Sequence, residues 1–174
     1  MQRDQLEHVI RAASAITGAS EIVVIGSQSV LGQHPDAPAE LRVSIEADVF
    51  TFRDPADADL IDGSIGEGSP FHQTFGYYAH GVARDTAVLP RGWEDRLVRV
   101  ANANTGTGVG LCLEAHDLAV RKWVAGREKD LDYVRAMARL GLVHIDLLRA
   151  RLAETSLPDH TRALCDARLK TIGS

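Results

Sequence analysis

The chain has 174 residues, of which 45% are apolar and 25% charged, and its formal net charge is −5. This length and composition predict one folded globular domain and exclude a disordered chain. The apolar stretches are much shorter than the roughly 20 residues of a membrane span, and the charged start contains no signal-peptide core. Two distant cysteines, Cys112 and Cys165, argue against a disulfide framework and a cysteine zinc site, so we expect a reducing, cytoplasmic location.

Charge is distributed unevenly along the chain. Residues 1–115 carry 8 basic and 16 acidic side chains, whereas residues 116–174 carry 11 basic and 8 acidic ones. A site formed by residues from both regions would have an acidic side that binds cations and a basic side that binds phosphates. The alternative, which we favour for any single charge, is a solvated helix face.

The first elements alternate between helix and strand. Apolar residues recur at helical spacing over 6–16, and Gly18 ends the predicted helix. The β-branched run at 21–26 predicts a buried strand. Residues 26–32 then predict a turn into a short helix with Ser27 as its N-cap.

Residues 42–52 alternate in polarity, which predicts a strand with two distinct faces. One face is expected to carry Ile45, Ala47 and Val49, and the other Ser44, Glu46 and Asp48. The pair Asp54-Pro55 predicts the start of a helix that runs through Ile65. Glycines punctuate residues 63–81 and predict a flexible loop or lid, because the phosphate-loop ending of Lys and Ser/Thr is missing.

The second half contains the remaining strands and then a helical tail. Strands are predicted at 77–82, 97–102 and 109–115, and helices at 116–125, 127–141, 145–155 and 159–170. This order predicts an α+β fold. We expect an α/β core over 1–115 and a helical part over 116–174 that packs on it as one compact unit.

Glu46 and Asp48 are the strongest chemical signal in the sequence. Two residues apart on a strand, they point to one face with backbones about 6.5–7 Å apart. Carboxylates crowded in this way repel each other unless a cation or a base joins them. Mg²⁺ suits such a pair, since it binds one or two carboxylates and completes its shell with water and phosphate. Taken alone, the pair is better explained by a solvated strand face, because a Glu-x-Asp triplet is common.

Gly26 and Ser27 supply a second signal because they follow a buried strand and open a helix. Glycine permits close backbone approach, N–H groups of a first helical turn attract anions, and the serine hydroxyl can bind phosphate. Taken alone, the two residues are better explained by an ordinary capped helix. Together with the two-carboxylate strand, however, they describe a phosphate cradle beside a metal platform.

Charged residues around Gly126 form the third element: Lys122, Arg127, Lys129 and Asp130. A sharp turn there would bring Lys122 and Asp130 within reach of one site. Lys122 or Arg127 would then neutralise a triphosphate, and Asp130 would orient the lysine or bind a second metal. The alternative is a surface helix held by pairs of charges four residues apart.

Two further features leave their interpretation open. Glu114 is a candidate third carboxylate because it shares a strand face with Gly110 and Cys112. His72 and His80 flank an aromatic stretch that would stack on a base, or that simply packs against the core.

In this order the motifs resemble the DNA polymerase β nucleotidyltransferase superfamily: Gly-Ser after a strand, then Ser-x-Glu-x-Asp on the next one. The later run from Lys122 to Asp130 resembles its AbiEii/MenT-like branch of toxin nucleotidyltransferases. Residues 61–82 and 114–134 also look like a bacterial family of unassigned function in that branch. The resemblance covers residues 6 to about 141. The sequence departs from the pattern in having Glu46 where an aspartate is more usual, and a long gap between Ser27 and Glu46.

The resemblance implies a small mixed sheet with helices on one side. Glu46 and Asp48 would hold Mg²⁺ or Mn²⁺, and Gly26 and Ser27 would hold the phosphates of an NTP. Lys122 and Arg127 would also contact phosphate, and Asp130 would match a late acidic residue of the branch. The reaction would transfer NMP to a hydroxyl by in-line attack.

The acceptor and the partners stay open at this stage. RNA ends, proteins and small-molecule hydroxyls are candidate acceptors, and a second copy of the chain or an antitoxin-like protein is a candidate partner; a membrane is not. The alternative function is a catalytically degenerate module of a toxin–antitoxin or defence system that binds a nucleotide or a protein without turnover.

Overall fold

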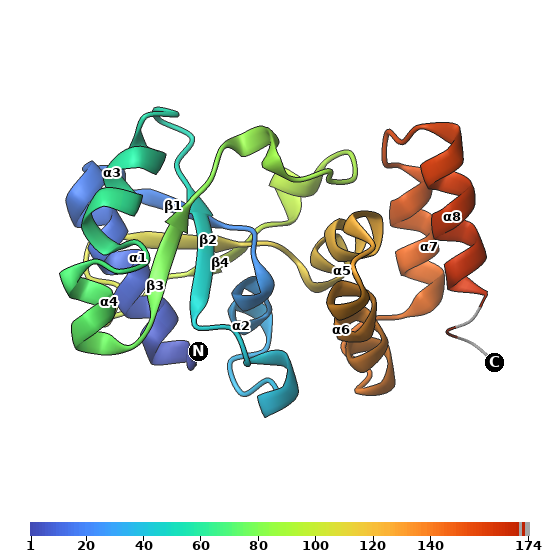
Figure 1. Cartoon of the computed structure of the whole chain (residues 1–174), viewed down its shortest axis with the longest axis horizontal. Coiled ribbons are helices and arrows are strands. Elements are labelled where there is room, and N and C mark those ends of the chain that lie inside the picture. The colour runs from blue at the N-terminus through green and yellow to red at the C-terminus, as the bar shows by residue number, and fades with distance from the viewer. Residues whose placement is uncertain (171, 173–174) are drawn as a thin grey trace. The chain divides into compact units, whose positions relative to one another are not determined.

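The computed structural model describes residues 1–170 and 172 and divides into two compact units. The sheet unit comprises residues 1–86 and 96–114, and the helical unit comprises 87–95 and the chain from 115 onward (Figure 1). The segment 87–95 thus groups with the C-terminal helices. The packing of a 116–174 part on a 1–115 core stays a prediction.

A five-stranded mixed sheet forms the centre of the sheet unit, in the order β3-β2-β1-β5-β4. The strands are β1 (Glu21–Val24), β2 (Glu46–Phe50), β3 (Tyr78–Gly81), β4 (Val98–Val100) and β5 (Val109–Cys112). β1 pairs antiparallel with β2 and parallel with β5, β2 pairs parallel with β3, and β4 pairs antiparallel with β5. Strands and helices mix as expected, so the predicted α+β class is confirmed.

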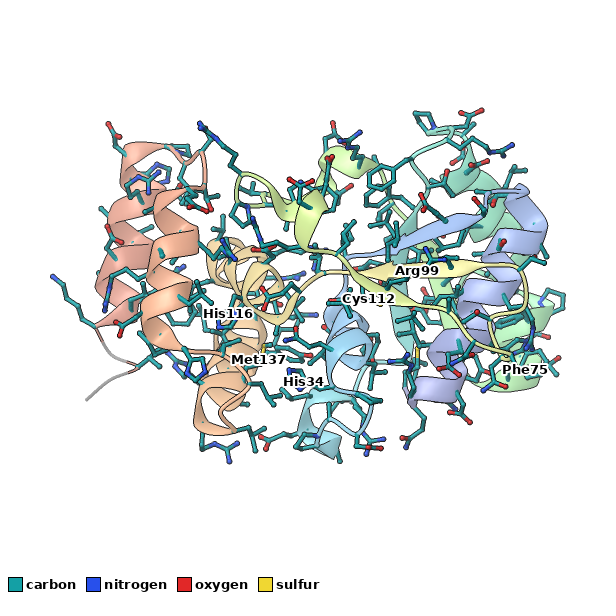
Figure 2. All side chains as sticks on the ribbon, turned by 180° about the vertical axis from the view of Figure 1, so that it is seen from behind. His34, Phe75, Arg99, Cys112, His116 and Met137 are labelled. Atoms are coloured by element: carbon teal, nitrogen blue, oxygen red, sulfur yellow. The ribbon has the colours of Figure 1, made fainter. Side chains whose placement is uncertain are left out.

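Four helices belong to the sheet unit: α1 (Arg3–Thr17), α2 (Val30–Gln33), α3 (Asp57–Ile65) and α4 (Pro70–Phe75). α1 buries an apolar stripe and ends as predicted, because Gly18 adopts φ +72°, a left-handed conformation that suits glycine. α1 and α2 contact the same face of β5. A Cβ on Gly110 would meet Ile10 of α1, and one on Gly32 of α2 would meet Cys112, which lies at the end of β5 (Figure 2).

α3 covers the same face of the neighbouring strands β2 and β3. Gly81 lies directly against the backbone of Ala58 in α3, and its register partner Val49 is fully buried. Because side chains alternate along a strand, Glu46 and Asp48 project from the opposite face. The helices of the sheet unit therefore cover one side of β2 and β3. They do not cover the other side, which carries Glu46 and Asp48.

Three sequence-based expectations about local structure are wrong. Ser27 is the first residue of a 3₁₀ turn (η1, Ser27–Ser29), and Gly26 takes its N-cap position. β2 is shorter than 42–52, so Ile45 lies outside it and is 46% exposed. The segment 63–81 contains α4 instead of only a loop, since the Ser69 hydroxyl accepts a hydrogen bond from the His72 N–H and proline occupies the first helical position.

The helical unit contains α5 (Ala115–Ala125), α6 (Glu128–Arg139), α7 (Ile145–Ala153) and α8 (Asp159–Leu169). The predicted breaks are confirmed: Gly126 and Gly141 adopt φ +68° and +71°, and Pro158 precedes α8. Trp123 of α5 is fully buried, and its Nε1 donates to the carbonyl oxygen of Cys165 in α8 at 3.1 Å. This bond satisfies the indole N–H inside an apolar core.

Across residues 1–170 and 172, we find no helix with the length and apolarity needed to cross a membrane.

Gly81→Ala is expected to destabilise the sheet unit. A Cβ at this position would lie 2.1 Å from the Ala58 carbonyl oxygen, so β3 and α3 must separate. We expect a loss of about 1–3 kcal/mol in the free energy of unfolding, measured by urea denaturation. The matched control is Gly63→Ala in α3, where a Cβ meets nothing within 4 Å. A gain of about 0.5–1 kcal/mol is expected there, and equal effects of the two variants would contradict the packing described.

Candidate functional site

Four polar side chains gather on the face of β2 and β3 opposite α3. The parallel register places Glu46 beside Tyr78 and Asp48 beside His80, and the two strands lie side by side (Figure 1). Alternation along each strand puts all four side chains on one face. The sequence pattern predicts the shared face of Glu46 and Asp48, and the structure adds Tyr78 and His80 to it.

The side chains are in direct contact. His80 Nδ1 lies 3.1 Å from Glu46 Oε1 and 3.5 Å from Asp48 Oδ1, and the Tyr78 hydroxyl donates to Glu46 Oε2 at 3.2 Å. Donor atoms of Glu46, Asp48 and His80 all lie within 4.8 Å of one another. The side chains are 36%, 19% and 50% exposed, respectively. We call Glu46, Asp48 and His80 the acid–histidine cluster. Each of the three side chains is partly exposed, so solvent reaches the cluster.

Electrostatic repulsion within the acid–histidine cluster is visible at Glu46. Its pKa is raised by partial burial and by the neighbouring Asp48, while Tyr78 and His80 partly offset the rise. Burial and then the negative charge of Glu46 raise the pKa of Tyr78 to about 12, so its hydroxyl keeps its proton at neutral pH and donates. A cation placed here would relieve the repulsion between the two carboxylates.

The Gly26 turn lies directly beside Asp48. The Ile25 N–H donates to the Asp48 carbonyl oxygen at 3.0 Å, which fixes the end of β1 against β2. A Cβ on Gly26 would lie 2.8 Å from Asp48 Oδ2. Only glycine leaves room for the carboxylate in its present position, so two motifs separate in the sequence meet at one place.

Two buried polar groups follow in the same turn. Gln28 and Ser29 are fully buried. Among the described residues, Gln28 Oε1 and Ser29 Oγ have no hydrogen-bond partner, although Gln28 Nε2 donates to the Ser44 carbonyl oxygen at 3.1 Å. Buried oxygens without a hydrogen-bond partner are rare in folded proteins and call for an explanation. Their presence here suggests that this turn has a role besides packing. Ser27, the predicted phosphate ligand, is half-buried at its start.

Asp62 of α3 holds β3 in position from the helix-covered side. Its Oδ1 accepts the Gly81 N–H at 2.8 Å. Gly81 is adjacent to His80, so this bond and the tight packing of Gly81 on α3 fix the backbone from which His80 projects. The position of the imidazole on β3 therefore follows from the fold.

Glu114, the candidate third carboxylate, lies two residues beyond the end of β5. The Leu113 N–H still pairs with the Val24 carbonyl oxygen at 3.0 Å, but the regular strand ends before Glu114. Within the described part of the chain, the group of metal-ligating side chains around Glu46 and Asp48 has His80 as its third member and does not include Glu114.

Lys122, Arg127 and Asp130 meet in the helical unit. Lys122 Nζ lies 3.1 Å from Asp130 Oδ1, Arg127 Nε lies 2.5 Å from Asp130 Oδ2, and Lys122 Nζ also lies 4.4 Å from the centre of the Tyr133 ring. The turn at Gly126 brings α5 and α6 together so that this contact forms. Lys122 is 5% exposed and Asp130 is 1% exposed, whereas Lys129 is exposed.

Burial and charge act in opposite directions in this buried ion pair. Burial lowers the pKa of Lys122, although Asp130 opposes the shift. Burial alone would raise the pKa of Asp130, but hydrogen bonds and charge from Arg127 and Lys122 together lower it. Each group therefore depends on the other to hold its charge in this buried place.

Sequence reasoning treated His80 as an aromatic-region residue together with His72, and did not connect it with the carboxylates. A usable signal exists: Tyr78 and His80 are two residues apart in a strand, as Glu46 and Asp48 are. What the sequence does not show is that these two strands are neighbours in register. The centre of the His72 ring instead lies 4.7 Å from the centre of the Tyr78 ring.

Comparison with known families adds one finding. Residues 4–165 match the family described as "nucleotidyltransferase of unknown function (DUF6036)". The match covers most of the chain, which therefore belongs to this nucleotidyltransferase family. No curated protein and no solved structure gave a significant match.

Asp130→Asn is expected to destabilise the helical unit, because it leaves the buried Lys122 amine without its carboxylate. We expect a loss of roughly 3 kcal/mol or more in the free energy of unfolding at pH 7. The matched control is Asp132→Asn, which removes an exposed pair with Arg135 and should cost about 0.5 kcal/mol or less. Urea denaturation measures both, and similar midpoints would refute the assignment of a buried pair.

Proposed function

We propose that this chain is a metal-dependent nucleotidyltransferase that transfers NMP from an NTP to a hydroxyl, on a core of the polymerase β type. Family membership supports the reaction class. The observation that carries the proposal is the pair Glu46 and Asp48, held on an open strand face directly beside the Gly26 turn.

The donor chemistry of this face fits a divalent cation. Two carboxylates converge on one region, and the absent side chain of Gly26 leaves space at Asp48 Oδ2. In our proposal, Glu46 and Asp48 hold Mg²⁺ or Mn²⁺, which neutralises charge on the phosphates in the transition state. Tyr78 positions Glu46 through its hydrogen bond to Oε2.

The turn that begins at Gly26 is the proposed phosphate site. Gly26 would allow a phosphate to approach the backbone, and the Ser27 hydroxyl would donate to a phosphate oxygen. Asp48 of β2 adjoins this turn, so the proposed metal ligand and the proposed phosphate donor come from neighbouring segments. The assignment of Lys122 and Arg127 to the triphosphate, with Asp130 orienting the lysine, stays a prediction for the helical unit.

The reaction is a phosphoryl substitution. The acceptor hydroxyl oxygen forms a bond to the α-phosphorus, and the bond from this phosphorus to the oxygen that bridges to the β-phosphorus breaks. Pyrophosphate leaves with that electron pair, and the hydroxyl proton passes to solvent. Positioning and charge neutralisation supply most of the catalysis in this class of reaction.

Asp48→Asn is expected to abolish metal-dependent NTP binding and NMP transfer. The carboxylate that adjoins both Gly26 and His80 would lose its charge, and affinity for the metal should fall at least about tenfold. Calorimetry with each NTP and Mg²⁺ or Mn²⁺ measures binding, and labelling of cell extract with α-labelled NTP measures transfer. The control is Asp59→Asn, an exposed aspartate of α3. Retained label transfer in Asp48→Asn would refute the proposal, and binding without transfer in the wild type would favour the degenerate binding module.

Gly26→Ala is expected to impair the same binding without unfolding the protein. A Cβ here would displace the Asp48 carboxylate, whose terminal oxygen it would approach to 2.8 Å. We expect metal-dependent NTP affinity to fall about tenfold while the urea midpoint changes little, because the atoms nearest to the new Cβ all belong to the side chain of Asp48 and not to the backbone. Gly63→Ala serves as the control. Unchanged affinity in Gly26→Ala would show that this turn is not part of the site.

A further inference from the structure

We propose that His80 is a third metal ligand and that it makes the site prefer Mn²⁺, a first-row transition ion, to Mg²⁺. This inference deepens the proposed function and rests on its metal site. It assigns a role to a residue that the carboxylate motif does not contain, and it names the class of ion that the site takes.

The distances within the acid–histidine cluster match those between ligands of one ion. Ligands about 2.1 Å from a metal lie about 3.0 Å apart at neighbouring octahedral positions and about 3.4 Å apart in a tetrahedron. His80 Nδ1 lies 3.1 Å from Glu46 Oε1 and 3.5 Å from Asp48 Oδ1. The two distances from His80 therefore suit a shared ion, and the donor atoms of all three side chains lie within 4.8 Å of one another.

The surrounding fold fixes this arrangement from three sides. The register of β2 and β3 sets His80 opposite Asp48. Asp62 and the packing of Gly81 hold the backbone next to His80. Gly26 leaves the space that a Cβ would fill beside Asp48. Two carboxylates and an imidazole thus project from rigid strands towards one open region.

Ligand chemistry decides which ion fits. Mg²⁺ prefers an all-oxygen shell, whereas imidazole nitrogen suits first-row transition ions. Of the first-row ions, Mn²⁺ is the one that suits carboxylate and water oxygens, and a nucleotide substrate adds phosphate oxygens to these. The cluster is open to solvent on the His80 side, where half of the side chain is exposed, so positions remain for those oxygens.

The alternative role for His80 is a hydrogen bond to Glu46 that only steadies the carboxylate. The two roles differ in what an aspartate at this position would do. As a ligand, aspartate converts the site to an all-oxygen one and shifts its preference towards Mg²⁺. As a replacement for a hydrogen-bond donor, it adds a third negative charge and does not favour one dication specifically.

The test measures Mn²⁺ binding to the full chain without nucleotide, by electron paramagnetic resonance, with Mg²⁺ as the competitor. The wild type should bind one Mn²⁺ in preference to Mg²⁺. His80→Ala should weaken Mn²⁺ binding about tenfold with a smaller effect on Mg²⁺, and His80→Asp should lower the ratio of the Mg²⁺ and Mn²⁺ dissociation constants about tenfold. His160→Asp, at an exposed position in α8, should change neither constant.

The outcomes separate this inference from the proposed function. An unchanged ratio in both His80 variants, with Mn²⁺ binding still lost in Asp48→Asn, overturns the role of His80 and leaves the proposed function intact. A shifted ratio without any transfer of NMP supports the metal ligand and counts against the transferase. Urea denaturation of each variant confirms that it folds, as the exposure of His80 leads us to expect.

Discussion

Repulsion between two carboxylates is the constraint on which the candidate site depends. Glu46 and Asp48 share one face of β2 because Ala47 and Val49 between and beyond them are buried on the other. The strand cannot turn its acids apart without exposing that apolar face. Partial burial and then Asp48 hold the pKa of Glu46 above its usual value, and Tyr78 and His80 only partly offset this rise. A cation bound here would lower the repulsion between the two carboxylates.

Local signals in the sequence predicted the elements well. The buried strand β1 follows from its β-branched residues, and the end of α1 follows from Gly18. The errors concern where an element ends and elements that are too short to show a periodic pattern. Ile45 continues the polarity alternation of β2 but lies just before the first residue of the strand, and its side chain is 46% exposed. α4 is too short for a helical period to be visible, and only its two ends, Ser69-Pro70 and the C-cap Gly76, mark it.

In the candidate site as well, the sequence predicts the local contacts and misses those between distant segments. The shared face of Glu46 and Asp48 is a property of one strand, so alternation suffices to predict it. The contact between Lys122 and Asp130 spans one glycine turn and is also nearly local. The place of His80 depends on β2 pairing in parallel with β3, across more than thirty residues of chain. The contact of Gly26 with Asp48 likewise needs the β1–β2 pairing. Single-sequence reasoning has no rule that specifies such partners.

The two charged clusters differ in how their charges are satisfied, and this difference indicates where a ligand is needed. In the helical unit, each oxygen of Asp130 has a cationic partner, and the group is buried apart from Arg127. Such a cluster is stable without any addition, and removing a member is what costs energy. In the sheet unit, two carboxylates share one imidazole and one hydroxyl on an open face. In the proposed function, a metal ion that also binds a triphosphate would neutralise these two carboxylates.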